Sequence, residues 1–344
     1  MRRPSHDRSG SSKTLTRLYF FWWTSAATRT VRERLSSCGT PWRRSSQPVR
    51  ARTKGQNIME RIVDANGIRL WCETFGDPAD PALLLVMGLG ARGTTWPDEL
   101  CRLLQEGGRY VIRYDNRDTG LSGRVDYEAT PYTMVDLAQD AIGLLDSLGI
   151  ATADVVGASM GGMIAQEIAL EHADRLRSLT LIMSSAQPLD PATNTFRGAQ
   201  RDPQLAAWDA EQIADPPSTR EEHIAAQLKL ARIITGRLTA FDEAATREII
   251  ERQIESATNA AHAVKNHILA AFASRDRSGL IGSITAPTLV IHGTDDRMAP
   301  FAQGEALAAA ISDSKFLPIE GMGHEFPPQA IPRISDAILR HIGQ

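Results

Sequence analysis

One serine of the chain has the neighbours that a nucleophilic serine requires. Ser159 stands in Gly157-Ala158-Ser159-Met160-Gly161, the only Gly-x-Ser-x-Gly pattern of the sequence, between an apolar run and an amphipathic stretch. A reactive serine on a sharp turn from strand to helix needs small residues two positions away on either side, because larger side chains would collide there. Gly157 and Gly161 supply them. The pattern is short, and a glycine-rich turn at a helix start is the structural alternative.

Such a serine also needs a histidine base and a carboxylate that orients the histidine. After an elbow of this kind, the acid precedes the histidine along the chain. Two histidines follow the last predicted strand. His341 ends an amphipathic segment near the C-terminus, where we expect it to be solvated. His324 lies in the glycine-rich segment Gly321-Met322-Gly323-His324, from which it can reach the serine, so we predict it as the general base.

Two adjacent carboxylates compete for the role of the acid. Asp295 and Asp296 both follow the apolar run Thr288–His292. We expect one of them to face the histidine and the other to cap the next helix or to pair with Arg297. Their positions alone leave the choice open.

A glycine-rich loop follows the apolar run Ala82–Met87, and it fits two chemistries. Gly88-Leu89-Gly90-Ala91-Arg92-Gly93 matches the dinucleotide fingerprint, and Asp115 ends the next strand, as a nicotinamide-dependent oxidoreductase would require. The residues after Gly93 are, however, a poor helix start. In the other interpretation the N–H groups of Leu89 and Met160 form an oxyanion hole. We favour this one, because it also uses the serine, the acid and the histidine.

The elements that must position these residues alternate between strands and helices. Short apolar runs are typical of strands buried on both faces of a parallel sheet. The expected strands are 82–87, 110–114, 153–156, 179–183, 288–292 and 315–319, after a hairpin around Asn66-Gly67, and the expected helices are 133–148, 160–172, 304–311 and 330–341. This alternation predicts an α/β fold with a mostly parallel, doubly wound sheet. Between Met183 and Thr288 we expect no strand, only an inserted helical cap at about 187–284.

Charge divides the chain into two parts. Residues 1–58 carry 13 Lys and Arg against 2 Asp and Glu, whereas the remainder carries 25 against 39. We interpret residues 1–58 as a disordered basic extension, dispensable for folding, with Met59 as an alternative start; a genuine basic tail and a targeting segment are the alternatives. The acidic body, 59–344, argues against nucleic-acid binding. Sparse cysteines and the lack of a long apolar run favour a cytoplasmic protein without a membrane span.

With these motifs in place, residues from about 60 onward resemble the bacterial α/β-hydrolase family that includes aclacinomycin methylesterase and related esterases and lipases. The resemblance rests on short segments along the body: Phe75-Gly76-Asp77-Pro78, Leu84–Gly88, Arg113–Ser122, the Ser159 elbow, Asp296–Pro300 and Gly321–His324. In relatives the acid lies four residues before the proline that opens the next helix, which implies Asp296 here. The family also implies that Asp115 and Arg117 belong to a structural turn fixed by ion pairing.

The predicted reaction is hydrolysis of a carboxylic ester of a small or medium apolar substrate, through Ser159, Asp296 and His324. No cofactor and no metal is expected, and the expected partner is the small-molecule ester. The same three residues also fit thioester hydrolysis, C–C bond hydrolysis or cofactor-free perhydrolysis. A hydrolase-like binding protein without turnover is the alternative from another class.

Overall fold

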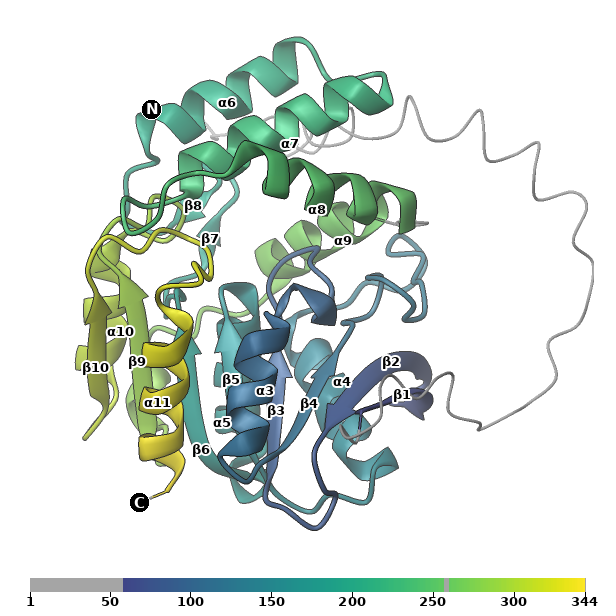
Figure 1. Ribbon diagram of the computed structural model, residues 1–344, viewed down its shortest axis with the longest axis vertical. Helices are drawn as coiled ribbons and strands as arrows, with labels where there is room; N and C mark the ends of the chain where they lie inside the picture. The colour runs from purple at the N-terminus through teal and green to yellow at the C-terminus, as the bar shows by residue number, and fades with distance from the viewer. Residues whose placement is uncertain (1–57, 257–259, 344) are drawn as a thin grey trace, which may run out of the picture.

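An eight-stranded sheet forms the centre of the computed structural model, which describes residues 58–256 and 260–343 (Figure 1). The strand order is β1-β2-β4-β3-β5-β6-β9-β10. β2 runs antiparallel to both of its neighbours, β1 and β4, and the other neighbours are parallel. The strands are β1 (Ile58–Ala65), β2 (Ile68–Phe75), β3 (Ala82–Val86), β4 (Tyr110–Tyr114), β5 (Ala153–Ala158), β6 (Leu176–Ile182), β9 (Thr288–Gly293) and β10 (Lys315–Ile319).

Helices cover both faces of the sheet and its upper end (Figure 1). They are α3 (Asp98–Glu106), α4 (Met134–Ser147), α5 (Met160–Glu171), α6 (Pro203–Ala214), α7 (Arg220–Ile234), α8 (Glu243–Ser256), α9 (Ala260–Ala273), α10 (Phe301–Ala310) and α11 (Ile331–Ile342), with short 3-10 helices η2 (Gly93–Thr95), η3 (Ala173–Arg175) and η4 (Ile281–Ser283). The predicted α/β fold with its mostly parallel, doubly wound sheet is confirmed.

The two layers around the sheet follow from the alternation of side chains along each strand. In β3, Leu84 and Val86 pack with α4 and α5 on one face, whereas Leu83 and Leu85 pack with α3 and α11 on the other. All four side chains are fully buried. Successive residues of a strand point to opposite faces, so a strand covered on both sides must be apolar throughout.

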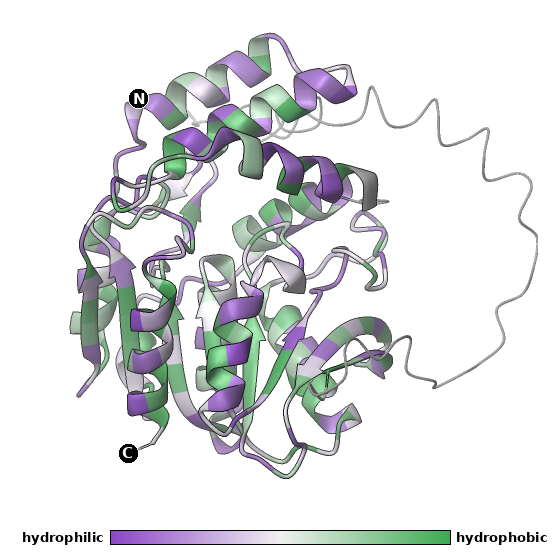
Figure 2. Ribbon diagram, in the orientation of Figure 1, coloured by the Kyte–Doolittle hydropathy of each residue, from purple (hydrophilic) through white to green (hydrophobic). Residues whose placement is uncertain are grey.

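Helices α6 to α9, called the cap helices below, lie over the carboxyl ends of the parallel strands (Figure 1). Figure 2 shows a largely hydrophobic sheet, whereas α6, α7 and α8 alternate hydrophobic and hydrophilic residues. Ile224, Leu228 and Ile250 of α7 and α8 form a small apolar cluster of their own. Helices α7 and α8 therefore pack against each other apart from the two main cores, whereas α9 adds Ala270 and Ala271 to the core on one face of the sheet.

The structure differs from the expected elements at two places, and a third expectation concerns residues outside those described. The interval between Met183 and Thr288 does contain strands, a two-residue ladder of β7 (Leu189–Asp190) and β8 (Thr195–Phe196). Helix α3 was not predicted, although it buries Leu100, Cys101 and Leu104. The expectation for the N-terminal extension falls on residues outside those described, except Ile58, which begins β1.

No helix among the described residues is long and apolar enough to cross a membrane.

A buried ion pair fastens the loop after β4 to helix α4. Arg117 donates two hydrogen bonds of 2.6 Å to the carboxylate of Asp140, whose side chain is fully buried. Asn66 in the β1–β2 turn donates a third, at 2.9 Å. The expected ion pairing of this turn therefore exists, but its acid is Asp140 and not Asp115.

Removing the buried acid should cost far more stability than removing an exposed acid from the same helix. Asp140→Ala leaves the buried guanidinium of Arg117 without its counter-charge, so we expect the free energy of unfolding to fall by about 3–5 kcal/mol. Asp146 pairs with Arg175 at the end of α4, but its side chain is 60% exposed, so Asp146→Ala should cost about 0–1 kcal/mol. Urea unfolding of both variants gives the comparison, and equal losses would contradict the role assigned to the buried pair.

Candidate active site

Ser159 occupies the turn between β5 and α5 with a strained backbone. Its φ of 55° and ψ of −123° lie in a region that residues other than glycine rarely adopt. A Cβ on Gly157 would lie 2.3 Å from the carbonyl oxygen of Gly161, and one on Gly161 would lie 2.0 Å from that of Val86. Both glycines are therefore required by close backbone contacts, for the steric reason given above.

His324 lies beside the serine. Its Nε2 is 3.0 Å from Ser159 Oγ, although 165 residues separate the two in the sequence. The histidine ends the glycine-rich segment Gly321–His324, which follows β10, and its side chain is 11% exposed. Its backbone N–H donates to the carbonyl oxygen of Ile234, at 2.8 Å, at the end of cap helix α7. The loop is thus fixed from the cap side as well as from the sheet.

Asp296 lies on the other side of the imidazole. Its Oδ2 is 2.7 Å from His324 Nδ1, and its Oδ1 accepts hydrogen bonds from the backbone N–H groups of Met298 and Ala299 at 2.9 and 2.8 Å. The side chain is fully buried. These donors fix the position of the carboxylate, which accepts the hydrogen on Nδ1 of the imidazole and so leaves the Nε2 lone pair facing the serine.

A second histidine borders this acid without competing for its role. His292 Nε2 lies 2.8 Å from the carbonyl oxygen of Ala299, to which it donates, and 3.5 Å from Asp296 Oδ2. Burial lowers the pKa of His292. The imidazole of His292 is therefore neutral and does not form an ion pair with Asp296, which bonds to His324 instead.

The neighbouring carboxylate, Asp295, points elsewhere. Its Oδ2 accepts the backbone N–H of Arg237 at 3.1 Å, and its Oδ1 lies 3.5 Å from the guanidinium of that residue. Of the two alternatives expected for the second carboxylate, capping the next helix or pairing with Arg297, the ion pair is not the one found, because Arg297 lies 3.4 Å from Asp202. Asp295 therefore joins the sheet domain to the cap, and the structure brings Asp296 alone of the two to His324.

The loop with the predicted oxyanion donor packs directly against the serine. A Cβ on Gly88 would lie 3.0 Å from the Cβ of Ser159 and 3.5 Å from its Oγ, so the residue before Leu89 touches the serine. Met160 is the first residue of α5, where a backbone N–H has no acceptor within the helix. The N–H of Met160 thus lies next to Ser159 in the chain, and Leu89 follows the residue that packs against the serine; an oxyanion hole formed by the two amides stays a prediction.

The same loop does not have the geometry of a dinucleotide site. Gly93 leads into the 3-10 helix η2 and not into an α-helix. The buried carboxylate of Asp115 accepts the N–H of Gly93 at 2.8 Å on one oxygen and the N–H of Leu121 at 2.9 Å on the other. Asp115 is thus a clamp for two backbone turns, and its resemblance to a ribose-binding acid is coincidental.

The family model for the alpha/beta hydrolase fold matches residues 81–329, most of the chain. The chain is an α/β hydrolase. It is 31% identical over 293 residues to rhodomycin D methylesterase DauP of Streptomyces sp. (strain C5), which covers 82% of this chain and 97% of the relative. Rhodomycin D methylesterase DnrP of Streptomyces peucetius is 30% identical with the same coverage.

Solved structures agree on the fold of this α/β hydrolase. The enol-lactonase from Burkholderia xenovorans LB400 superposes with a TM-score of 0.67 over 82% of this chain and all of that chain, at 23% sequence identity. At that sequence identity the superposition shows a shared fold. The match places this chain's mostly parallel sheet with its helices within a known architecture.

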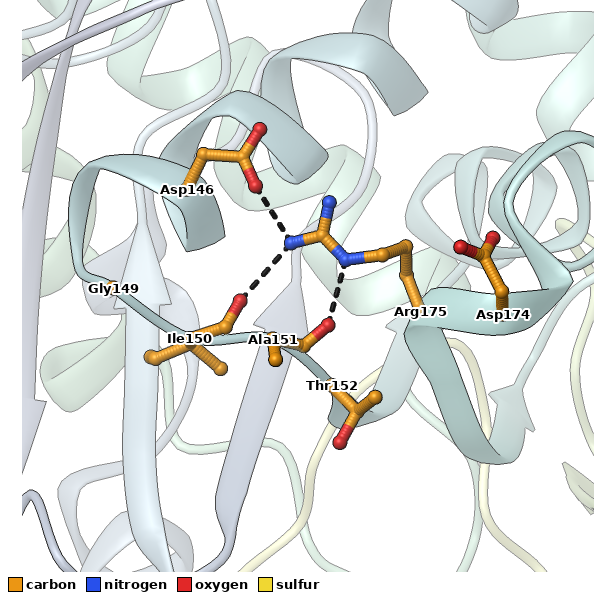
Figure 3. A pocket seen from close by; sticks show the side chains of 7 residues that line it. All are labelled: Asp146, Gly149, Ile150, Ala151, Thr152, Asp174 and Arg175. Atoms are coloured by element: carbon orange, nitrogen blue, oxygen red, sulfur yellow. Dashed lines mark hydrogen bonds and ion pairs between the residues drawn. The ribbon is translucent and has the colours of Figure 1, made fainter.

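One surface hollow of the hydrolase lies far from Ser159. It is lined by Asp146, Gly149, Ile150, Ala151, Thr152, Asp174 and Arg175, ahead of β5, whereas Ser159 follows the other end of that strand. Figure 3 shows the guanidinium of Arg175 bonded to Asp146 and to the carbonyl oxygens of Ile150 and Ala151. The polar groups that line the hollow therefore bond to one another and hold the turn before β5.

Among the described residues, no cluster of His, Cys, Asp or Glu could hold a metal ion.

Sequence patterns missed two contributors near the site and misplaced a third residue. Glu325 accepts the N–H groups of Gly236 and Gly323 at 3.2 and 3.3 Å, and His267 contacts the loop after β3. In the sequence, only its position next to His324 indicated Glu325.

His341, expected to be solvated, is buried and donates to the carbonyl oxygen of Pro287 at 3.1 Å.

The two adjacent aspartates provide a matched test of the site. Asp296→Asn keeps the shape but removes the anion that fixes the tautomer of His324, so we expect kcat for an activated ester to fall by about 10³-fold or more. Asp295→Asn should stay within about threefold of wild type. Steady-state kinetics with p-nitrophenyl acetate measures both. Similar effects of the two substitutions, or a larger effect at Asp295, would refute the assignment.

Proposed function

We propose that this hydrolase cleaves a carboxylic ester through an acyl-enzyme on Ser159. The observation that carries the proposal is the continuous chain of contacts from Asp296 through His324 to Ser159 Oγ, at 2.7 and 3.0 Å. A serine hydroxyl is a weak nucleophile unless an adjacent base removes its proton. Here the base is in hydrogen-bond reach and is itself oriented by a buried carboxylate.

In the first half of the reaction, the Oγ proton of Ser159 moves to His324 Nε2 while Oγ bonds to the ester carbonyl carbon. The carbonyl electron pair moves onto oxygen and forms a tetrahedral oxyanion. When the carbonyl re-forms, the bond to the alcohol oxygen breaks, and the proton on Nε2 passes to that leaving oxygen. Asp296 stabilises the imidazolium that exists between the two proton transfers.

In the second half, water takes the place of the alcohol. His324 accepts a proton from water as its oxygen attacks the acyl carbon, and then returns the proton to Ser159 Oγ as the carboxylic acid leaves. The oxyanion formed in each half accepts hydrogen bonds from the N–H groups of Leu89 and Met160. The N-terminus of α5 adds the positive end of its dipole at the same place. Every step uses groups of this chain and water.

Relatives favour an ester over the other bonds that such a site can cleave. Two relatives at 31% and 30% identity are named methylesterases and align over nearly their whole length. We infer a small-molecule ester, with an alcohol leaving group as small as methanol, as the substrate class. Thioester hydrolysis, C–C bond hydrolysis and perhydrolysis use the same serine chemistry, and a panel of acyl substrates separates them.

Loss of the serine hydroxyl should strongly reduce turnover without unfolding the protein. We expect Ser159→Ala to fold with the wild-type melting temperature and to lose about 10³-fold or more in kcat on p-nitrophenyl esters. Ser283→Ala, at an exposed position outside the site, is the control and should behave as wild type.

A fluorophosphonate probe separates an enzyme from a binding protein with the same fold. An activated serine bonds to phosphorus and expels fluoride, so intact-protein mass spectrometry should show a single adduct that Ser159→Ala lacks. A wild-type protein that neither acquires this adduct nor hydrolyses any ester of the panel would overturn the proposal.

A further inference from the structure

A buried histidine of the cap connects the oxyanion loop to the turn after β4. His267 lies on α9, which runs between α8 and the sheet in Figure 1, and its side chain is fully buried. Its Nδ1 lies 3.0 Å from the backbone nitrogen of Gly90, one residue after Leu89. Its Nε2 lies 2.9 Å from the carbonyl oxygen of Arg117. The imidazole therefore fills the space between two backbone segments of the sheet domain.

The two partners fix the tautomer of this histidine. A carbonyl oxygen only accepts, so Nε2 must carry the hydrogen that is donated to Arg117. A backbone N–H only donates, so Nδ1 must offer its lone pair to Gly90. Burial lowers the pKa of His267, which keeps the ring neutral as both bonds require. Protonation would place a hydrogen on each nitrogen and would break the contact with Gly90.

Gly90 has little freedom to adopt another position. Its φ is +66°, and a Cβ there would lie 2.5 Å from a methyl group of Val264, one turn before His267 on α9. On either side, Asn116 donates to the carbonyl oxygen of Met87 at 3.0 Å, and Asp115 accepts the N–H of Gly93. The loop is thus pinned at its two ends by the sheet domain and in the middle by the cap.

The middle contact is the one that governs the orientation of Leu89. The N–H of Gly90 belongs to the peptide plane that follows Leu89, so its direction sets the ψ angle of Leu89. A buried N–H without an acceptor is destabilising, so a peptide that loses its acceptor rotates to find another. Such a rotation would also turn the adjacent plane, which carries the N–H of Leu89, the proposed oxyanion donor.

We infer that His267 is a positioning residue for the oxyanion site: by accepting the N–H of Gly90 it holds the N–H of Leu89 toward the carbonyl oxygen of the substrate. This inference rests on the proposed ester hydrolysis. It assigns to a cap residue, outside the chain of Ser159, His324 and Asp296, a part in stabilising the transition state. His267 itself touches no reacting atom.

Two amide substitutions separate the two hydrogen bonds of this ring. His267→Asn places an amide oxygen near the position of Nδ1, so it can still accept from Gly90 while it loses the bond to Arg117. His267→Gln places an amide nitrogen near the position of Nε2, so it can still donate to Arg117 while it loses the bond to Gly90. The variants lose one buried hydrogen bond each, and a merely structural histidine would respond to both alike.

The decisive readout is the affinity for a trifluoromethyl ketone, which adds to the serine and forms an oxyanion. We expect His267→Gln to raise its Ki and to lower kcat by about 10–100-fold with KM within threefold, because the loss is confined to the state that bears the oxyanion. His267→Asn should stay within about threefold of wild type in both. His262, exposed on the same helix, is the control, and its Asn and Gln variants should match wild type.

Melting temperatures of all variants accompany the kinetics. Equal losses of Ki and kcat in the Asn and Gln variants, or a Gln variant with wild-type Ki, would overturn the inference. If His267→Gln does not fold, His267→Asn decides alone: retained affinity supports the inference, and a loss overturns it. A wild-type protein that is not inhibited by the ketone and cleaves no ester would instead refute the proposed function, and the inference would fall with it.

Discussion

The backbone of Ser159 is the constraint on which the rest of the site depends. A non-glycine residue with φ of 55° and ψ of −123° costs about 1–3 kcal/mol, and it persists only where its surroundings determine it completely. Here the N–H of Ser159 donates to Ile182 at 2.9 Å, and its carbonyl oxygen accepts from Gly162 and from the hydroxyl of Ser184. The parallel sheet supplies this support, since Ile182 ends the neighbouring strand β6.

The sheet also explains how distant residues meet. Ser159, Asp296 and His324 follow β5, β9 and β10, whose carboxyl ends share one edge because the strands are parallel. Between β6 and β9 the chain leaves to form the cap, which returns to contact both loops of the site. The segment after α7 bonds to the His324 loop, where Leu238 donates to Gly321 at 2.8 Å, and His267 bonds to the loop of Leu89. The cap is thus bonded to the loops that hold the candidate catalytic groups.

Local patterns predicted the parts of this structure that are set locally. The Ser159 elbow and the buried strands are recognisable because steric limits and burial restrict which residues fit there. The choice between Asp295 and Asp296 was not local, since it depends on which carboxylate Met298, Ala299 and His324 surround in space; the resemblance to relatives supplied it.

Other features escaped because they depend on tertiary contacts. His341 lies at a helix end close to the C-terminus, yet it is buried and bonds to Pro287, just before β9. His267 sits in a cap helix with no pattern around it, and its partners, Gly90 and Arg117, lie 177 and 150 residues away. Helix α3 was overlooked between two well-marked strands, although the spacing of Leu100 and Leu104 matches one helical face.

A structure of the trifluoromethyl ketone adduct would test the central claim most directly, because it locates the oxyanion itself. The ketone carbon should be bonded to Ser159 Oγ, with its oxygen about 2.7–3.1 Å from the backbone nitrogens of Leu89 and Met160 and with His324 still on Asp296. An adduct on another residue, or an oxygen directed away from both amides, would contradict the proposed catalysis by this elbow.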